Sequence, residues 1–139
     1  MVQKELAKRF ISAPDTPDYG SVTASIMYYT NAKLLFGVSA GSFYPAPKVD
    51  SAVIRIEGIP ENERIPVKNK EIFFRVIKAA FAMRRKTLVN NLSQEFGISK
   101  ADCAEILKTL NIKETVRGEV LAPKDFARIA DAVAERYKI

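Results

Sequence analysis

The chain of 139 residues contains no histidine, no tryptophan and one cysteine, Cys103. The missing histidine excludes the commonest general base, the serine and cysteine triads that depend on it, and most zinc sites. A single cysteine cannot form a disulfide within the chain, which is typical of cytoplasmic proteins, and we expect Cys103 to be a packing residue. We therefore expect a cytoplasmic protein without a metal site.

Long apolar runs and glycine-rich loops are also missing. No run approaches the 18 or so residues that a membrane span needs, and the opening MVQKELAKRF carries charges every few residues instead of the apolar segment of a secretory signal. None of the six glycines begins a G-x-G-x-x-G motif or a P-loop. The residues thus predict no membrane segment, no nucleotide cradle and no self-contained catalytic constellation.

Basic residues are concentrated in one stretch. Lys68 to Lys86 holds seven basic residues and one acidic residue, so this stretch carries a net charge of +6, equal to that of the whole chain. Charge concentrated in this way favours an anionic polymer as partner. A solvated helix face would give the same pattern, and charge alone does not decide between the two.

Hydrophobic periodicity divides the chain into a mixed first part and a helical second part. In residues 1–58 it predicts a helix over 2–11 with Val2, Leu6, Phe10 and Ile11 on one face, a helix over 21–29, and strands over 33–38 and 52–57. Residues 59–69 are polar, contain two prolines and form a predicted linker. We therefore expect an α+β fold, with two or three strands followed by an all-α lobe over 70–139.

Within the lobe, the residues predict helices over 70–82, about 86–95, from Ser99 and from Pro123. Residues 70–82 carry Phe73, Ile77, Ala80 and Phe81 at helical spacing. An unbroken helix would place Arg84 on that apolar side, so we expect a break near Met83–Arg84.

The segment Ser42–Ser51 is a stiff loop that leads into the second strand. Pro45 and Pro47 fix two φ angles and favour extended geometry before them. Phe43 stands at the mouth of this loop and Lys48 follows the second proline, an arrangement that suits stacking on a nucleobase. The alternative is that Phe43 plugs the end of the sheet and Lys48 is solvated, and the residues alone favour it because most aromatics beside strands are core.

Four separated segments resemble one family. They are MVQKE (1–5), F-x-P-x-P-K-V-D-S-A-V (43–53), AFAMRRKTLVNNL (80–92) and VRGEVLAPKDFARIADA (116–132). In this order they resemble the KsgA-type ribosomal RNA adenine dimethyltransferases. Members of that family are Rossmann-like, S-adenosylmethionine-dependent methyltransferases followed by a small helical domain, and they dimethylate N6 of two adjacent adenines of small-subunit ribosomal RNA. The resemblance implies that MVQKE is a late strand running into a helix.

The resemblance also implies what the chain lacks. The family's cofactor motif and its catalytic Asn-Leu-Pro-Tyr motif precede the MVQKE point, and neither occurs here. We therefore expect a fragment: the C-terminal part of the methyltransferase domain (1–58), the linker (59–69) and a helical RNA-binding domain (70–139). We expect it to be inactive alone, to have no catalytic or cofactor-binding residue of its own, and not to bind S-adenosylmethionine by itself.

By resemblance, Phe43 stacks on the target adenine, and Arg84, Arg85 and Lys86 rest on the RNA of a 30S-type subunit. Lys48 either holds a neighbouring phosphate or anchors its loop. Arg84 either contacts phosphate or pairs with a carboxylate inside the lobe. Asp50 and Ser51 are expected to brace the turn.

Two other functions fit the same residues. One is a free-standing RNA-binding or ribosome-assembly module without catalysis. The other is a fragment of a resistance methyltransferase that acts on large-subunit ribosomal RNA. In each case so small a sheet should expose apolar edge and face and favour self-association.

Overall fold

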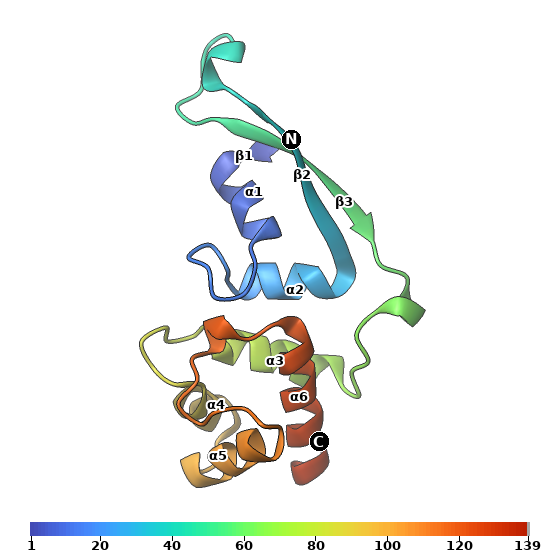
Figure 1. Ribbon diagram of the computed structural model, residues 1–139, viewed down its shortest axis with the longest axis vertical. Helices are drawn as coiled ribbons and strands as arrows, with labels where there is room; N and C mark the ends of the chain where they lie inside the picture. The colour runs from blue at the N-terminus through green and yellow to red at the C-terminus, as the bar shows by residue number, and fades with distance from the viewer. Residues whose placement is uncertain (139) are drawn as a thin grey trace.

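The computed structural model describes residues 1–138 and shows an elongated α+β molecule with a sheet at one end and a helical lobe at the other (Figure 1). The helices and strands are β1 (Val2–Gln3), α1 (Lys4–Ile11), α2 (Ser21–Tyr29), β2 (Thr30–Val38), β3 (Ser51–Gly58), α3 (Lys70–Ala80), α4 (Leu88–Phe96), α5 (Lys100–Thr109) and α6 (Pro123–Tyr137). Short 3-10 helices lie at Ala40–Ser42, Glu61–Glu63 and Gly118–Val120. None of the helices within residues 1–138 is both long enough and apolar enough to cross a membrane.

The sheet is antiparallel, with β3 between β1 and β2. The β2–β3 register runs from Thr30 opposite Gly58 to Val38 opposite Ser51 and is interrupted by an irregularity between Leu34 and Phe36. Both predicted strands are confirmed, although each is longer than its apolar centre. The extra residues are polar or small and join the strands through backbone pairing.

The predicted helix over 2–11 is wrong in its first residues. Val2 and Gln3 pair with Ala52 and Ser51 as strand β1, and α1 starts at Lys4. The strand followed by a helix that the family resemblance implied is therefore present. The expected apolar face is also wrong, because Ala7 is the buried residue of α1, whereas Leu6 and Ile11 are exposed.

The sheet leaves large apolar side chains in contact with solvent. Phe36 is 57% exposed and Ile56 is 51% exposed, and Leu34 and Leu35 are open to a similar degree. β2 has β3 on one side only, so the backbone groups of its outer edge have no strand partner within residues 1–138. The exposure expected from so few strands is confirmed.

The helical lobe starts its helices where capping chemistry predicts. The side chains of Asn69, Thr87 and Ser99 accept hydrogen bonds from the backbone N–H groups of Ile72 (3.2 Å), Asn90 (3.3 Å) and Asp102 (3.1 Å). Pro123 opens α6 in the first turn, where its missing N–H costs nothing. The predicted break after α3 is confirmed, because Phe81 ends that helix and α4 starts only after Thr87.

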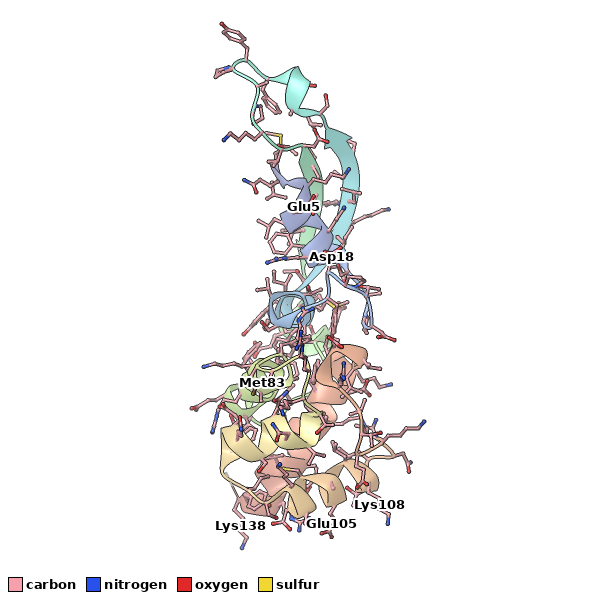
Figure 2. The ribbon with its side chains drawn as sticks, turned by 90° about the vertical axis from the view of Figure 1, so that its left-hand side faces the viewer. Glu5, Asp18, Met83, Glu105, Lys108 and Lys138 are labelled. Atoms are coloured by element: carbon pink, nitrogen blue, oxygen red, sulfur yellow. The ribbon has the colours of Figure 1, made fainter. Side chains whose placement is uncertain are left out.

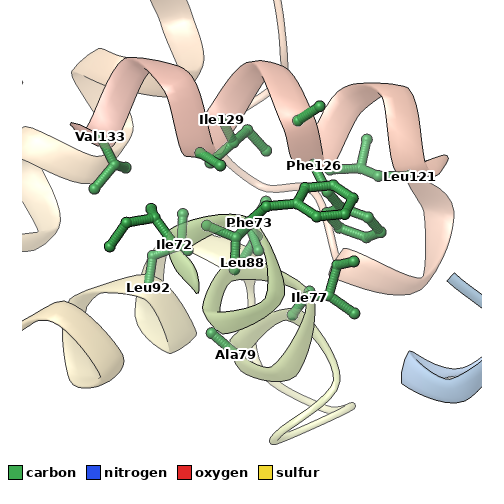
Figure 3. Close-up of a cluster of buried hydrophobic side chains, with 14 of the residues drawn as sticks. Ile72, Phe73, Ile77, Ala79, Leu88, Leu92, Leu121, Phe126, Ile129 and Val133 are labelled. Carbon is green, nitrogen blue, oxygen red and sulfur yellow. The ribbon is translucent and has the colours of Figure 1, made fainter. Parts of the chain in front are cut away.

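Apolar side chains of α3, α4 and α6 pack into the core shown in Figure 3, where Phe73, Leu88, Phe126 and Ile129 are fully buried. The core also includes Tyr19, Ala24 and Tyr28 from the first part of the chain. Ile65 and Val67 of the expected linker pack against it. The division into domains at 59–69 stays a prediction, and one continuous core spans it.

Candidate nucleic-acid interface

The loop between β2 and β3 lies at the tip of the hairpin, at the opposite end of the molecule from the helical lobe (Figure 1). Asp50 holds its base, since a carboxylate oxygen of Asp50 accepts a hydrogen bond from the backbone N–H of Ala40 at 2.9 Å. The bracing role expected for Asp50 is thus confirmed. Ser51 is the first residue of β3, and bracing by its side chain stays a prediction.

Three side chains of this loop differ in exposure. Phe43 is half-buried, while Tyr44 beside it is fully exposed at 102%. Lys48 is exposed and has no hydrogen bond or ion pair with the described residues. The adenine-stacking role of Phe43 and the alternatives for Lys48 stay predictions.

The basic stretch Lys68 to Lys86 does not form one uniform charged face, because two of its seven cations pair with carboxylates. Lys68 pairs with Glu135 of α6 at 3.5 Å. Arg75 pairs with Glu95 of α4 at 3.0 Å, and its guanidinium lies 4.5 Å from the centre of the Phe96 ring. Carboxylates on neighbouring helices thus neutralise part of the positive charge of this stretch.

The turn Met83–Lys86, here called the basic turn, joins α3 to α4. The backbone N–H of Lys86 donates to the Met83 carbonyl at 3.0 Å and closes the turn. Arg85 and Lys86 are exposed and have no side-chain partner among the described residues. Figure 2 looks at the side of the molecule that carries Met83, where this turn faces outward.

Arg84 does not pair with a carboxylate of the described residues, and its contact with phosphate stays a prediction. Its guanidinium donates to the backbone carbonyl of Tyr19 at 3.1 Å and so ties the basic turn to the first part of the chain. It also lines a polar hollow of about 380 Å³, together with Arg9, with Asp18 and with Ser21 at the start of α2. The guanidinium has further donors that remain available in this hollow.

Arg9 was not singled out from the sequence. It is one of several charges on α1, and nothing in its spacing distinguishes it from Lys4 or Lys8. The fold alone brings it into the same hollow as Arg84, because α1 packs against α2 and Arg84 bonds to the Tyr19 carbonyl just before α2. The hairpin loop that carries Phe43 and the basic turn remain separate, with α1 and α2 lying between them along the molecule (Figure 1).

The sequence matches the family model described as ribosomal RNA adenine dimethylase over residues 1–135. The chain belongs to this family. Ribosomal RNA small subunit methyltransferase A of Streptococcus thermophilus is 44% identical over 138 residues, an alignment covering 97% of this chain and 47% of that protein. The protein of the same name from Pelotomaculum thermopropionicum is 43% identical over 133 residues, covering 95% of this chain and 45% of the relative. The chain thus spans about half the length of the curated relatives that it matches.

Solved structures agree with the fold. A dimethyladenosine transferase from Plasmodium falciparum superposes with a TM-score of 0.72 at 22% identity, covering 98% of this chain and 55% of that one. The 23S rRNA methyltransferase ErmE gives a TM-score of 0.60 at 18% identity, covering 94% of this chain and 51% of that one. Both are methyltransferases, and at these identities the likeness is evidence for the fold only.

The residues present do not fit S-adenosylmethionine, the methyl donor of the family. The hollow between α1 and the sheet measures about 200 Å³ and is mostly apolar, below the roughly 300–1,000 Å³ of small-molecule sites. The larger hollow is lined by Arg9, Arg84 and Asp18, so its charged groups carry a net positive charge, which opposes a sulfonium cation. We therefore derive no methyl-transfer step on this chain.

Proposed function

We propose that this chain supplies the target-adenine loop and the RNA-docking lobe of an S-adenosylmethionine-dependent (adenine-N6,N6-)-dimethyltransferase of small-subunit ribosomal RNA, and that it does not methylate by itself. The observation that carries the docking role is the basic turn, where Arg85 and Lys86 are exposed and unpaired among the described residues. Cations held on a turn can approach phosphates closely, and arginine can bind a phosphate through two hydrogen bonds. Such contacts position the RNA without reading its sequence.

The adenine-binding role belongs to Phe43. Its half-buried ring is held by the loop that Asp50 braces, so the stacking face needs little ordering when a base arrives. Stacking of a base on an aromatic side chain is worth roughly 1–3 kcal/mol. The named small-subunit relatives, at 43–44% identity, support small-subunit RNA as the substrate over the large-subunit alternative.

The docking role is tested by the salt dependence of binding to a fluorescent RNA hairpin that presents two adjacent adenines in its loop. Replacing Arg85 and Lys86 by alanine should lower the slope of log affinity against log salt by about 1.4–1.8, because each phosphate contact contributes about 0.7–0.9. The matched control replaces Lys100 and Lys108 of α5, which removes the same charge elsewhere in the lobe. Equal slopes for the parent and the turn variant, or an equal loss in the control, would place the footprint elsewhere.

The adenine role is tested with Phe43→Ala and the same hairpin carrying uridines in place of the two adenines. We expect Phe43→Ala to abolish the preference for the adenine hairpin, whereas Tyr44→Ala, one residue away, retains it. A preference lost only in Tyr44→Ala would transfer the stacking role to Tyr44. Calorimetric titration with S-adenosylmethionine should show no binding, and micromolar binding by this chain would refute the proposal that it lacks the cofactor site.

A further inference from the structure

Asn91 is a buried polar side chain with an unusual hydrogen-bonding state. It lies on α4, is 2% exposed, and its side-chain amide nitrogen donates to the carbonyl oxygen of Met83 at 3.3 Å. Its side-chain oxygen is buried without a hydrogen-bond partner in residues 1–138. Thr23, also polar and buried, is by contrast satisfied, since its hydroxyl donates to the Arg9 carbonyl and accepts the N–H of Gly20.

This arrangement does not favour stability of the core. A buried amide whose oxygen lacks a partner costs free energy that an apolar side chain of similar shape avoids. Leu88 and Leu92 of the same helix are also buried, in apolar packing. What Asn91 provides, and an apolar residue could not, is a donor for the Met83 carbonyl.

The Met83 carbonyl is the point at which the basic turn closes. It accepts the N–H of Lys86 at 3.0 Å as well as the amide of Asn91, so it is fixed from two directions. Beyond the turn, the N–H of Leu88 donates to the Val116 carbonyl at 2.8 Å. Arg85 therefore sits between backbone groups that are held on both sides.

We propose that Asn91 is a positioning residue for RNA binding: it holds the Met83 carbonyl and thereby fixes the geometry in which Arg85 and Lys86 meet phosphates. This inference rests on the docking role proposed for the basic turn. It adds a residue that never touches RNA but determines how many phosphate contacts the turn makes. Without the Asn91 hydrogen bond the basic turn keeps its positive charge, but Arg85 and Lys86 are no longer held in position to meet phosphates.

The test is Asn91→Leu, which keeps the side chain's approximate size and removes the donor. We expect affinity for the fluorescent adenine hairpin to fall about three- to tenfold and the salt slope to fall by about 0.7–0.9, the share of one phosphate contact. Resistance to urea should be unchanged or higher, because a buried amide is replaced by an apolar group. Loss of RNA affinity without loss of stability is a result that a merely structural role cannot produce.

Ser93→Ala is the matched control. The hydroxyl of Ser93 donates to the Ile98 carbonyl at 2.6 Å, so this change removes a similar side-chain-to-backbone bond at the other end of α4. It should lower stability and leave the affinity and salt slope of the folded protein at the parent's values. If Asn91→Leu does not fold, Asn91→Ala is measured at a temperature where it is folded.

An Asn91 variant with the parent's salt slope would overturn the inference, as would a loss of affinity that only follows the unfolded fraction and recovers on cooling. The Arg85→Ala/Lys86→Ala variant separates this failure from failure of the proposed function. If that variant lowers the slope and Asn91→Leu does not, only the positioning role is wrong. If neither lowers it, the docking role of the turn and the role of Asn91 are both wrong.

Discussion

Tyr19 joins the two parts of the chain, and removing its hydroxyl should weaken the whole molecule. The side chain is fully buried, its hydroxyl donates to the Leu121 carbonyl at 2.7 Å, and its ring packs edge-to-face on Phe81 at 5.5 Å. Tyr19→Phe keeps the ring and leaves a buried carbonyl without its donor. The expected loss is about 1–3 kcal/mol of unfolding free energy.

For a chain of this length, 1 kcal/mol corresponds to about 4 °C in melting temperature, so the midpoint should fall by about 4–12 °C. Circular dichroism at 222 nm follows the helices directly. The matched control is Tyr44→Phe, the same chemical change at a hydroxyl that is fully exposed, and it should alter stability by less than about 0.5 kcal/mol. Because Tyr19 belongs to the first part and the helical signal comes mostly from the second, a shift of a single transition would show that one core holds both parts.

Alkaline pH provides a second measurement of the same contact. Burial, with Asp125 nearby, raises the pKa of Tyr19 far above its ordinary value. A tyrosine in the unfolded chain ionises near pH 10, so the contribution of Tyr19 to stability is complete below about pH 10 and is lost as the pH rises toward the folded-state pKa. The parent should therefore lose stability faster than Tyr19→Phe above about pH 10. Two outcomes would refute a core shared by both parts of the chain. One is a Tyr19→Phe variant with the parent's melting midpoint at neutral pH, and the other is two separate unfolding transitions.

Other contacts make similarly direct predictions. Gly118→Ala should lower stability by about 1–3 kcal/mol in the same melts, because the added Cβ would lie 2.5 Å from both the Cβ and the carbonyl oxygen of Ala80, and an unchanged midpoint would contradict this packing. Burial raises the pKa of the Cys103 thiol to about 11, so a disulfide reagent at pH 8 should react rapidly only in urea, and rapid reaction of the native chain would show that Cys103 is accessible. Two copies can pair their identical β2 edges antiparallel across a two-fold axis, so sedimentation should show concentration-dependent association that Phe36→Asp reduces, and a parent chain that stays monomeric would exclude it.

The sequence predicted best those features that depend on near neighbours along the chain. Ser99 caps α5 and Pro123 opens α6 because a cap bonds within three residues and proline fixes its own φ angle. The first residues were misassigned because β1 has only two of them, too few to show a period, and it exists through pairing with Ala52 and Ser51 far along the chain. Hydrophobic periodicity does not predict a feature such as β1, which depends on residues far along the chain.

The same difference between near and distant partners applies to the candidate nucleic-acid interface. Arg84 was expected to contact either a phosphate or a carboxylate. Among the described residues its partner is a backbone carbonyl 65 residues away, which no residue type indicates. Its contact with phosphate stays a prediction. Arg9 enters the same hollow only because α1 packs on α2. The exposure of Arg85 and Lys86, by contrast, follows from the predicted break after α3, since a turn projects its side chains away from the core.

Ion pairing within the basic stretch shows why its net charge overstates the number of RNA phosphates that it can contact. Lys68, which lies just before α3, and Arg75 of α3 pair with carboxylates on α6 and α4, whereas Arg85 and Lys86 have no such partner among the described residues. A footprint made of Arg85 and Lys86 predicts a salt slope of about 1.4–1.8, while all seven cations of the stretch would give about 5–6. Measuring the parent's slope therefore decides between the turn and the whole stretch. A value near the higher figure would mean that cations beyond the turn, such as the exposed Lys70 and Lys78 or the paired Lys68 and Arg75, also contact phosphates. The turn would then be only a part of the interface.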